Sequence, residues 1–69
     1  MTPCKAARKR LGMTIYDVAK SAALTPASIS RIENQKQTAS PDAAFRLAKI
    51  LGITEEKILY PERFPDLAA

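Results

Sequence analysis

Apolar residues recur at intervals of three and four positions along the chain, with polar and charged residues between them. This spacing places apolar side chains along one side of an α-helix, whereas a half-buried strand would alternate at every second position. No stretch of the sequence shows the strand pattern, and glycine occurs only twice. The pattern therefore predicts an all-α fold, divided into five short helices by residues that start and stop helices.

Each expected helix begins at or just after a hydroxyl residue whose oxygen can accept a hydrogen bond from the first turn. Three of the helices also carry proline at the first helical position, where an N–H has no helical partner in any case. Glycine after the first and fourth helices supplies the left-handed residue with which many helices end. The predicted spans are 3–11, 14 to 21 or 22, 26–34, 41–51 and 55–60, with Thr2, Thr14, Thr25, Ser40 and Thr54 as the capping residues.

Residues 1–60 are expected to form one domain, because a chain of 69 residues is close to the lower size limit for independent folding. The single cysteine, Cys4, cannot form an internal disulfide, and without histidine a zinc site is not expected. Cys4 is expected to be an inert or oxidisable thiol. Residues 61–69 are expected to be an extended tail that folds back or meets a partner. No metal, cofactor or small-molecule ligand is expected.

Residues 14–34 contain two of the predicted helices, separated by only three or four residues. So short a connection forces a sharp turn, and the two helices must cross at a steep angle. The small side chains of Ala19 and Ala22 allow a close approach, while Ile29 and Ile32 point inward. The residues left on the outer side of the second of these helices are Thr25, Pro26, Ala27, Ser28, Ser30 and Arg31.

The charge of the chain is unevenly distributed. Residues 1–36 carry seven Lys and Arg against two acidic residues, whereas residues 37–69 carry four against five. A basic half favours a polyanionic partner on one side of the molecule, although a solvated surface explains the same charges equally well. No apolar run is long enough to cross a bilayer and no signal peptide is visible, so a cytoplasmic location without membrane contact is the default expectation.

The segment 14–34 and the residues that follow it contain a recurring set of positions, which are Thr14, Val18, Ala19, Leu24, Thr25, the run from Ser28 to Asn34, Lys36, and the run from Leu47 to Ile53. On these residues the chain resembles the lambda-repressor and Cro-type helix-turn-helix family of phage-repressor-like regulators. The resemblance covers roughly residues 4–60 and implies a compact five-helix, lambda-repressor-like DNA-binding domain.

The resemblance implies that the third helix is the recognition helix, whose N-terminal half enters the major groove of double-stranded DNA. Arg31 is the residue best suited to read a base, because its planar fork can bond O6 and N7 of guanine together. A phosphate contact or a solvent-facing position is the alternative for Arg31. Pro26 and Ala27 can contribute only contact with a thymine methyl group or shape readout.

Two interpretations remain open for the hydroxyl residues of the third helix. Thr25 and Ser28 can bond base edges or phosphates, but capping of the helix uses the same groups. Ser30 can bond DNA or simply face solvent.

Phosphate contacts in this family come from the start of the second helix and from the loop after the third. Many members carry glutamine where this chain has Ile15, so one polar contact is absent. Tyr16 can replace it through its hydroxyl, or can pack into the protein. By position, the implied phosphate-contacting residues are Thr14, Ile15, Tyr16, Asn34, Lys36, Gln37, Thr38 and Ser40.

The resemblance also implies an ion pair that joins the first helix to the recognition helix, formed by Arg8 and Glu33. The remaining basic residues of the first helix, Lys5, Lys9 and Arg10, are interpreted as a solvated face, with a weak phosphate role as the alternative.

Two turn positions depart from the family pattern, because Ala23 and Gln35 stand where glycine is common. A residue with a side chain must there adopt a strained left-handed conformation or avoid it. We expect locally altered turns at both positions within an unchanged fold.

The function implied is that of a Cro-like repressor, which binds a palindromic operator as a homodimer, at least on DNA, and occludes a promoter. The candidate dimer surface is the fifth predicted helix, 55–60, and the tail, although Ile58 and Leu59 can instead complete the monomer core. The alternative is an antitoxin or other protein-interaction module, which a neighbouring toxin gene would favour. An enzyme is not expected, since no catalytic constellation is visible. The dimer candidates are Leu59, Tyr60, Phe64 and Leu67.

Overall fold

A hydroxyl residue caps every α-helix within residues 1–64, as the sequence predicts. The computed structural model describes residues 1–64, and within this range it contains five α-helices, one short 3-10 helix and no strand. The all-α prediction is therefore confirmed. The elements are α1 (Pro3–Arg10), α2 (Ile15–Ala22), α3 (Pro26–Glu33), α4 (Pro41–Leu51), α5 (Glu55–Leu59) and η1 (Pro61–Arg63).

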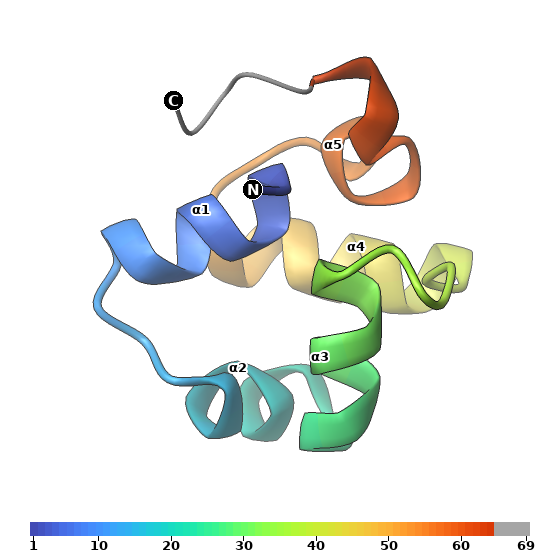
Figure 1. Ribbon diagram of the computed structural model, residues 1–69. Coiled ribbons are helices and arrows are strands. Elements are labelled where there is room, and N and C mark those ends of the chain that lie inside the picture. The colour runs from blue at the N-terminus through green and yellow to red at the C-terminus, as the bar shows by residue number, and fades with distance from the viewer. Residues whose placement is uncertain (65–69) are drawn as a thin grey trace.

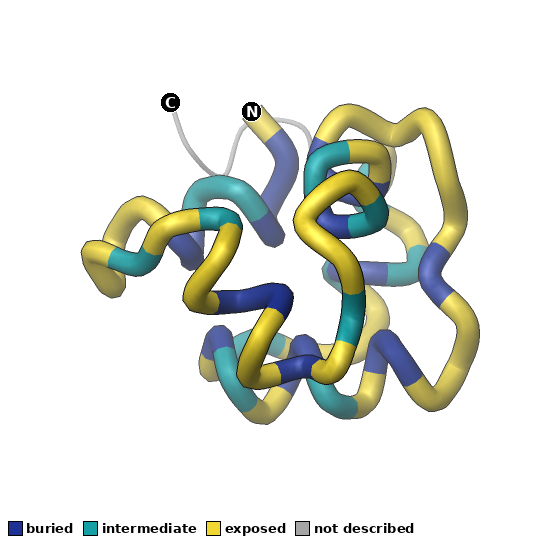
Figure 2. Tube along the Cα trace, turned by 90° about the horizontal axis from the view of Figure 1, so that it is seen from below, coloured by how far each residue is buried: buried dark blue, intermediate teal, exposed yellow. Residues whose placement is uncertain are grey.

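Helix α4 lies in the middle of the molecule, with α2 and α3 on one side and α1 and α5 on the other (Figure 1). Its inner stripe is fully enclosed, since Leu47 and Leu51 are at most 1% exposed. Val18 from α2 and Ile29 from α3 are the other large side chains that are completely buried. Figure 2 shows the resulting pattern, in which short buried stretches alternate with exposed ones along the helices.

Many buried positions of the core are alanine, which lets short helices pack closely. Ala22 and Ala44 have no exposed surface, and Ala7 and Ala19 have almost none. A core of small residues removes less apolar surface from water per residue than one of leucines, so close fit must supply part of the stability. None of the helices within residues 1–64 is both long enough and apolar enough to span a membrane.

The expectation of altered turns at Ala23 and Gln35 is wrong. Both residues adopt the left-handed conformation, with φ of 57° and 58°. Each is followed by a hydrogen bond that closes the helix end, from the Leu24 N–H to the Ala19 oxygen at 2.9 Å and from the Lys36 N–H to the Arg31 oxygen at 2.8 Å. These bonds satisfy carbonyls that would otherwise lack partners and thereby hold the strained residues in place.

The same geometry ends α1 and α4, where glycine occupies the left-handed position. Gly12 and Gly52 both have φ of 70°, and the N–H groups of Met13 and Ile53 close the helix ends. Within residues 1–64 one type of helix end thus occurs four times, twice with glycine and twice without it.

The expected extended tail is only partly correct. Residues 61–63 form a 3-10 turn that folds back, and an exposed hydrogen bond of 3.2 Å joins Arg63 to Glu56 of α5. The Phe64 ring lies under the Lys57 ammonium, 5.7 Å from the ring centre. Leu67, one of the dimer candidates, lies outside the described residues.

Candidate nucleic-acid interface

Helices α2 and α3 are joined by a three-residue turn and cross steeply at one side of the molecule (Figure 1). The buried faces of the two helices meet through Val18, Ala22 and Ile29, none of which has exposed surface. Leu24, in the turn, is half-buried and packs against this cluster. The turn is therefore rigidly supported from beneath, which fixes the angle at which α3 is presented.

The outer side of α3 is accessible. Thr25, Pro26, Ala27 and Arg31 are exposed, whereas Ser28 and Ser30 are half-buried. Hence the N-terminal half of α3 offers a surface of small side chains, with one long cationic side chain one helical turn further along. Such a surface can approach a groove closely without steric obstruction.

The hydroxyl groups of Thr25 and Ser28 are already engaged with each other. The Ser28 N–H donates to the Thr25 Oγ1 at 3.1 Å, and the two hydroxyl oxygens lie 3.0 Å apart. The capping role that the sequence left open for Thr25 is thus present. Each hydroxyl keeps some capacity for a further partner, since an oxygen of this kind has one donor and two acceptor positions.

The guanidinium group of Arg31 is held by the loop that follows α3. Its Nε donates to the Oε1 of Gln37 at 2.8 Å, and both side chains are exposed. The Nη groups have no partner of their own within residues 1–64. The sequence predicts only a phosphate contact for Gln37. It does not predict the bond to Arg31, because the two residues are six positions apart across a loop and no local pattern indicates a contact.

Two groups of candidate phosphate contacts flank α3. At the start of α2, Thr14 is exposed and Tyr16 is 73% exposed, so Tyr16 does not pack into the protein. Ile15 is half-buried against the core, which leaves only its backbone N–H for an anion. After α3, the exposed residues are Asn34, Gln35, Lys36, Gln37, Thr38 and Ser40.

The polar residues of the loop are partly committed to the ends of helices. The Asn34 Nδ2 donates to the Ser30 carbonyl oxygen at 2.8 Å, and the Ser40 Oγ accepts from the Ala43 N–H at 3.2 Å. The side chain of Lys36 is exposed and has no such partner within the described residues, so it is accessible to an external anion. A loop of this kind, beside the N-terminus of α4, can bind phosphate through backbone N–H groups and one lysine.

Behind α3 the structure brings Arg8 and Glu33 together. The Arg8 Nε lies 2.7 Å from Oε2 of Glu33 and its Nη2 lies 3.3 Å from Oε1, so the two groups form a two-pronged pair. The Glu33 side chain is 2% exposed and that of Arg8 is 11% exposed. The Arg8 Nη1 also donates to the Met13 carbonyl oxygen at 3.0 Å. One guanidinium therefore ties α1, the α1–α2 loop and α3 together.

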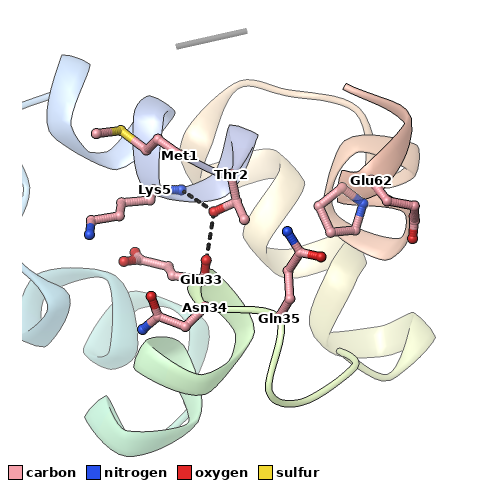
Figure 3. Close-up of a pocket in the computed structure, with 8 residues that line it drawn as sticks. Met1, Thr2, Lys5, Glu33, Asn34, Gln35 and Glu62 are labelled. Carbon is pink, nitrogen blue, oxygen red and sulfur yellow. Dashed lines mark hydrogen bonds between the residues drawn. The ribbon is translucent and has the colours of Figure 1, made fainter. Parts of the chain in front are cut away.

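An open cavity of about 450 Å³ lies between the N-terminus, the end of α3 and η1 (Figure 3). At its wall the Thr2 hydroxyl donates to the Glu33 carbonyl oxygen at 2.9 Å and accepts the Lys5 N–H at 3.4 Å. Met1, Asn34 and Gln35 also line the cavity. No group of three or more His, Cys, Asp or Glu that could hold a metal occurs among residues 1–64.

Two side chains, Asp17 and Cys4, have shifted pKa values. Hydrogen bonds from the backbone N–H and the hydroxyl of Thr14 lower the pKa of Asp17. They thereby favour the ionised form of this carboxylate, which is part of the capping box of α2. Burial, with the nearby Glu33 carboxylate, raises the pKa of the Cys4 thiol to about 12. Cys4 is 3% exposed, so the thiol is shielded both by protonation and by packing.

The structure leaves most of the expected base-reading and phosphate-binding residues exposed, on the outer side of α3, at the start of α2 and in the loop to α4. A family model described as Helix-turn-helix (HTH_3) matches residues 5–58 of the chain. No curated protein and no solved structure matches significantly.

Proposed function

The chain belongs to the lambda-repressor and Cro-type helix-turn-helix family of DNA-binding transcriptional regulators, and from this premise we propose that it is a repressor that binds a palindromic operator as a homodimer. The observation that carries the proposal is the accessible N-terminal half of α3, with exposed Tyr16 in the helix before it and exposed Lys36 in the loop after it.

In the proposed complex α3 lies in the major groove and the flanking residues contact the two phosphate backbones. Arg31 reads a guanine through two parallel hydrogen bonds, and the small side chains of Pro26 and Ala27 let the helix approach the base edges. Tyr16 and the loop after α3 fix the register of the helix on the duplex. Lys36 supplies charge that is independent of sequence.

The homodimer follows from the size of the module. One short recognition helix covers few base pairs, so two modules on one face of B-DNA are needed for high specificity. The candidate surface is the end of α5 and η1, where Tyr60 is 45% exposed and Phe64 is half-buried. Ile58 is buried and belongs to the core, whereas Leu59 is half-buried and packs against it. Of these residues, Tyr60 and Phe64 are therefore the ones that we propose to form the dimer contact.

Repression by steric occlusion is the simplest mechanism for a module of this kind, since a bound dimer covers promoter DNA without recruiting another protein. A reporter placed behind the selected operator tests it: expression falls when the protein is present. Increased expression would contradict the repressor assignment and leave DNA binding intact.

Selection of bound duplexes from a random pool tests the DNA-binding part. We expect enrichment of two inverted copies of one half-site, with centres about 10 base pairs or about 34 Å apart. Enrichment of a single half-site would contradict the palindromic operator. A failure to enrich any sequence at low salt would contradict sequence-specific binding.

A further inference from the structure

The side chain of Gln37 is placed to control the side chain that is proposed to read a base. Its Oε1 accepts the Nε–H of Arg31 at 2.8 Å. The turn that makes this contact possible is the left-handed Gln35, with φ of 58°, after which the chain reverses beside α3. The Lys36 N–H then bonds to the carbonyl oxygen of Arg31 at 2.8 Å. The loop therefore makes two hydrogen bonds to Arg31, one to its backbone and one to its guanidinium group.

Arg31 differs from the other paired arginines of the chain in the charge of its partner. Among residues 1–64, Arg8, Arg46 and Arg63 each pair with a carboxylate. Arg31 instead pairs with a neutral amide oxygen. An amide orients the guanidinium group without cancelling its charge, so the attraction to DNA is retained. A carboxylate at the same place would orient the group equally well but would weaken that attraction.

Occupation of Nε determines which edge of the guanidinium group remains for DNA. A guanidinium has five N–H donors in a fixed plane, and the bond to Gln37 uses the donor on Nε. The two Nη groups remain at the end of the fork and can meet O6 and N7 of guanine together. Gln37 keeps two N–H donors of its own on Nε2, which are free to contact a phosphate.

We propose that Gln37 is a positioning residue for base recognition, holding Arg31 so that the end of its fork faces the major groove. The inference rests on the proposed function and deepens it. Without Gln37, the side chain of Arg31 is mobile in the free protein and must be immobilised when it binds guanine. This entropic cost lowers the affinity only for the duplex that offers guanine. Removal of Gln37 therefore weakens base discrimination, whereas removal of a simple phosphate contact weakens all duplexes equally.

The test uses the selected half-site and three duplexes in which the base pair read by Arg31 is replaced in turn. Dissociation constants for the four duplexes are measured by fluorescence anisotropy. The base pair is identified as the one at which Arg31→Ala reduces the preference most. We expect Gln37→Ala to reduce the preference at this pair about three- to tenfold, the effect of immobilising one long side chain. Thr38→Ala, a change at the adjacent exposed position that is expected only to contact phosphate, should lower affinity for all four duplexes equally and leave the preference unchanged.

Gln37→Glu separates orientation from affinity. The glutamate keeps an acceptor for the Arg31 Nε–H, so the base preference should persist, while repulsion from phosphates lowers affinity for all four duplexes. In the Arg31→Ala background, Gln37→Ala should have no further effect on the preference. Both residues are exposed, and thermal unfolding monitored by circular dichroism verifies that the variants fold.

Three results would overturn the inference. An equal loss of affinity for all four duplexes in Gln37→Ala would reduce Gln37 to a phosphate contact. A loss of preference that persists when Arg31 is absent would show that Gln37 acts without it. An unchanged preference at every base pair of the half-site in Arg31→Ala would remove base reading by Arg31, and the role of Gln37 with it, whereas DNA binding itself would stand on the selection experiment.

Discussion

Arg8 and Glu33 form a buried, two-pronged ion pair, with the shorter of its two bonds at 2.7 Å. Because the pair lies on the inner side of α3, it fixes this helix from within while the outer side stays accessible. A buried pair of this kind contributes little net stability compared with apolar residues, but loss of one partner leaves the other charge without compensation.

Arg8→Met is therefore expected to lower the free energy of unfolding by about 3–5 kcal/mol, measured by urea denaturation. The matched control is Arg10→Met on the exposed side of α1, which should change stability by less than about 0.5 kcal/mol. The double variant Arg8→Met/Glu33→Leu should recover most of the loss. Equal effects of the Arg8 and Arg10 substitutions would contradict the structural role of the pair.

Arg31→Ala tests base reading directly. Loss of a bidentate contact to guanine is expected to cost about 1–3 kcal/mol on the preferred operator and to relax the preference at one base pair. Competition binding with operators altered at each position measures this change. Should affinity fall equally on every operator, Arg31 contacts phosphate and the base-reading assignment is wrong.

Lys36→Ala tests the phosphate role of the loop. Because a lysine that contacts phosphate releases about one counterion, the slope of log affinity against log salt should become less steep by about one. Affinity should fall to a similar extent on all sequences. Lys49→Ala is the control, since Lys49 lies on α4 over the Phe45 ring, 5.2 Å from the ring centre. An unchanged slope for the Lys36 variant would exclude this residue as a phosphate contact.

Ala23→Gly is expected to stabilise the protein. Ala23 holds φ of 57°, a conformation that is unfavourable for residues with a Cβ and accessible to glycine without strain. Relief of this strain should raise the free energy of unfolding by about 0.5–1 kcal/mol in urea denaturation. Ser21→Gly, at an exposed position inside α2, should lower it by a similar amount. A loss of stability in both variants would show that the turn at Ala23 is not strained.

Cys4 provides a prediction about pH. Folding raises its pKa from the ordinary thiol value of 9.0 to about 12, so the folded protein favours the protonated thiol. The unfolded chain releases this proton from about pH 9 upward and the folded protein does not, hence stability decreases between about pH 9 and 12. The slope is at most about 1.4 kcal/mol per pH unit.

The difference in unfolding free energy between the wild type and Cys4→Ala isolates this contribution from tyrosine and lysine titration. It should be constant below about pH 9 and should fall above it. Labelling with a thiol reagent gives an independent readout: Cys4 should react slowly in the folded protein and rapidly in urea. Fast labelling of the folded protein would contradict its burial.

The helices and their caps could be predicted from sequence because each depends on residues within four positions. Thr14 and Asp17 form the expected capping box, with bonds of 2.9 Å and 3.1 Å. Pro26 and Pro41 likewise stand at the first helical positions. The pair of Arg8 with Glu33 spans 25 positions and could be expected only through the resemblance to a family.

What the sequence did not predict depends on contacts across turns. The left-handed conformations of Ala23 and Gln35 result from hydrogen bonds that close the helix ends, and these outweigh a local preference of about 1 kcal/mol. The contact between Gln37 and Arg31 depends in turn on the reversal at Gln35. No periodicity in the sequence indicates such a contact, since the loop residues follow no regular spacing.

Met1 lies close to the end of α3, which matters for the design of binding measurements. Met1 lines the same cavity as Asn34 and Gln35, at the end of α3. A purification tag or fusion protein joined to Met1 would therefore emerge beside the surface proposed to meet DNA. A basic tag there would add sequence-independent affinity, and a bulky one would obstruct the duplex. Binding measurements should accordingly use protein from which any N-terminal extension has been cleaved.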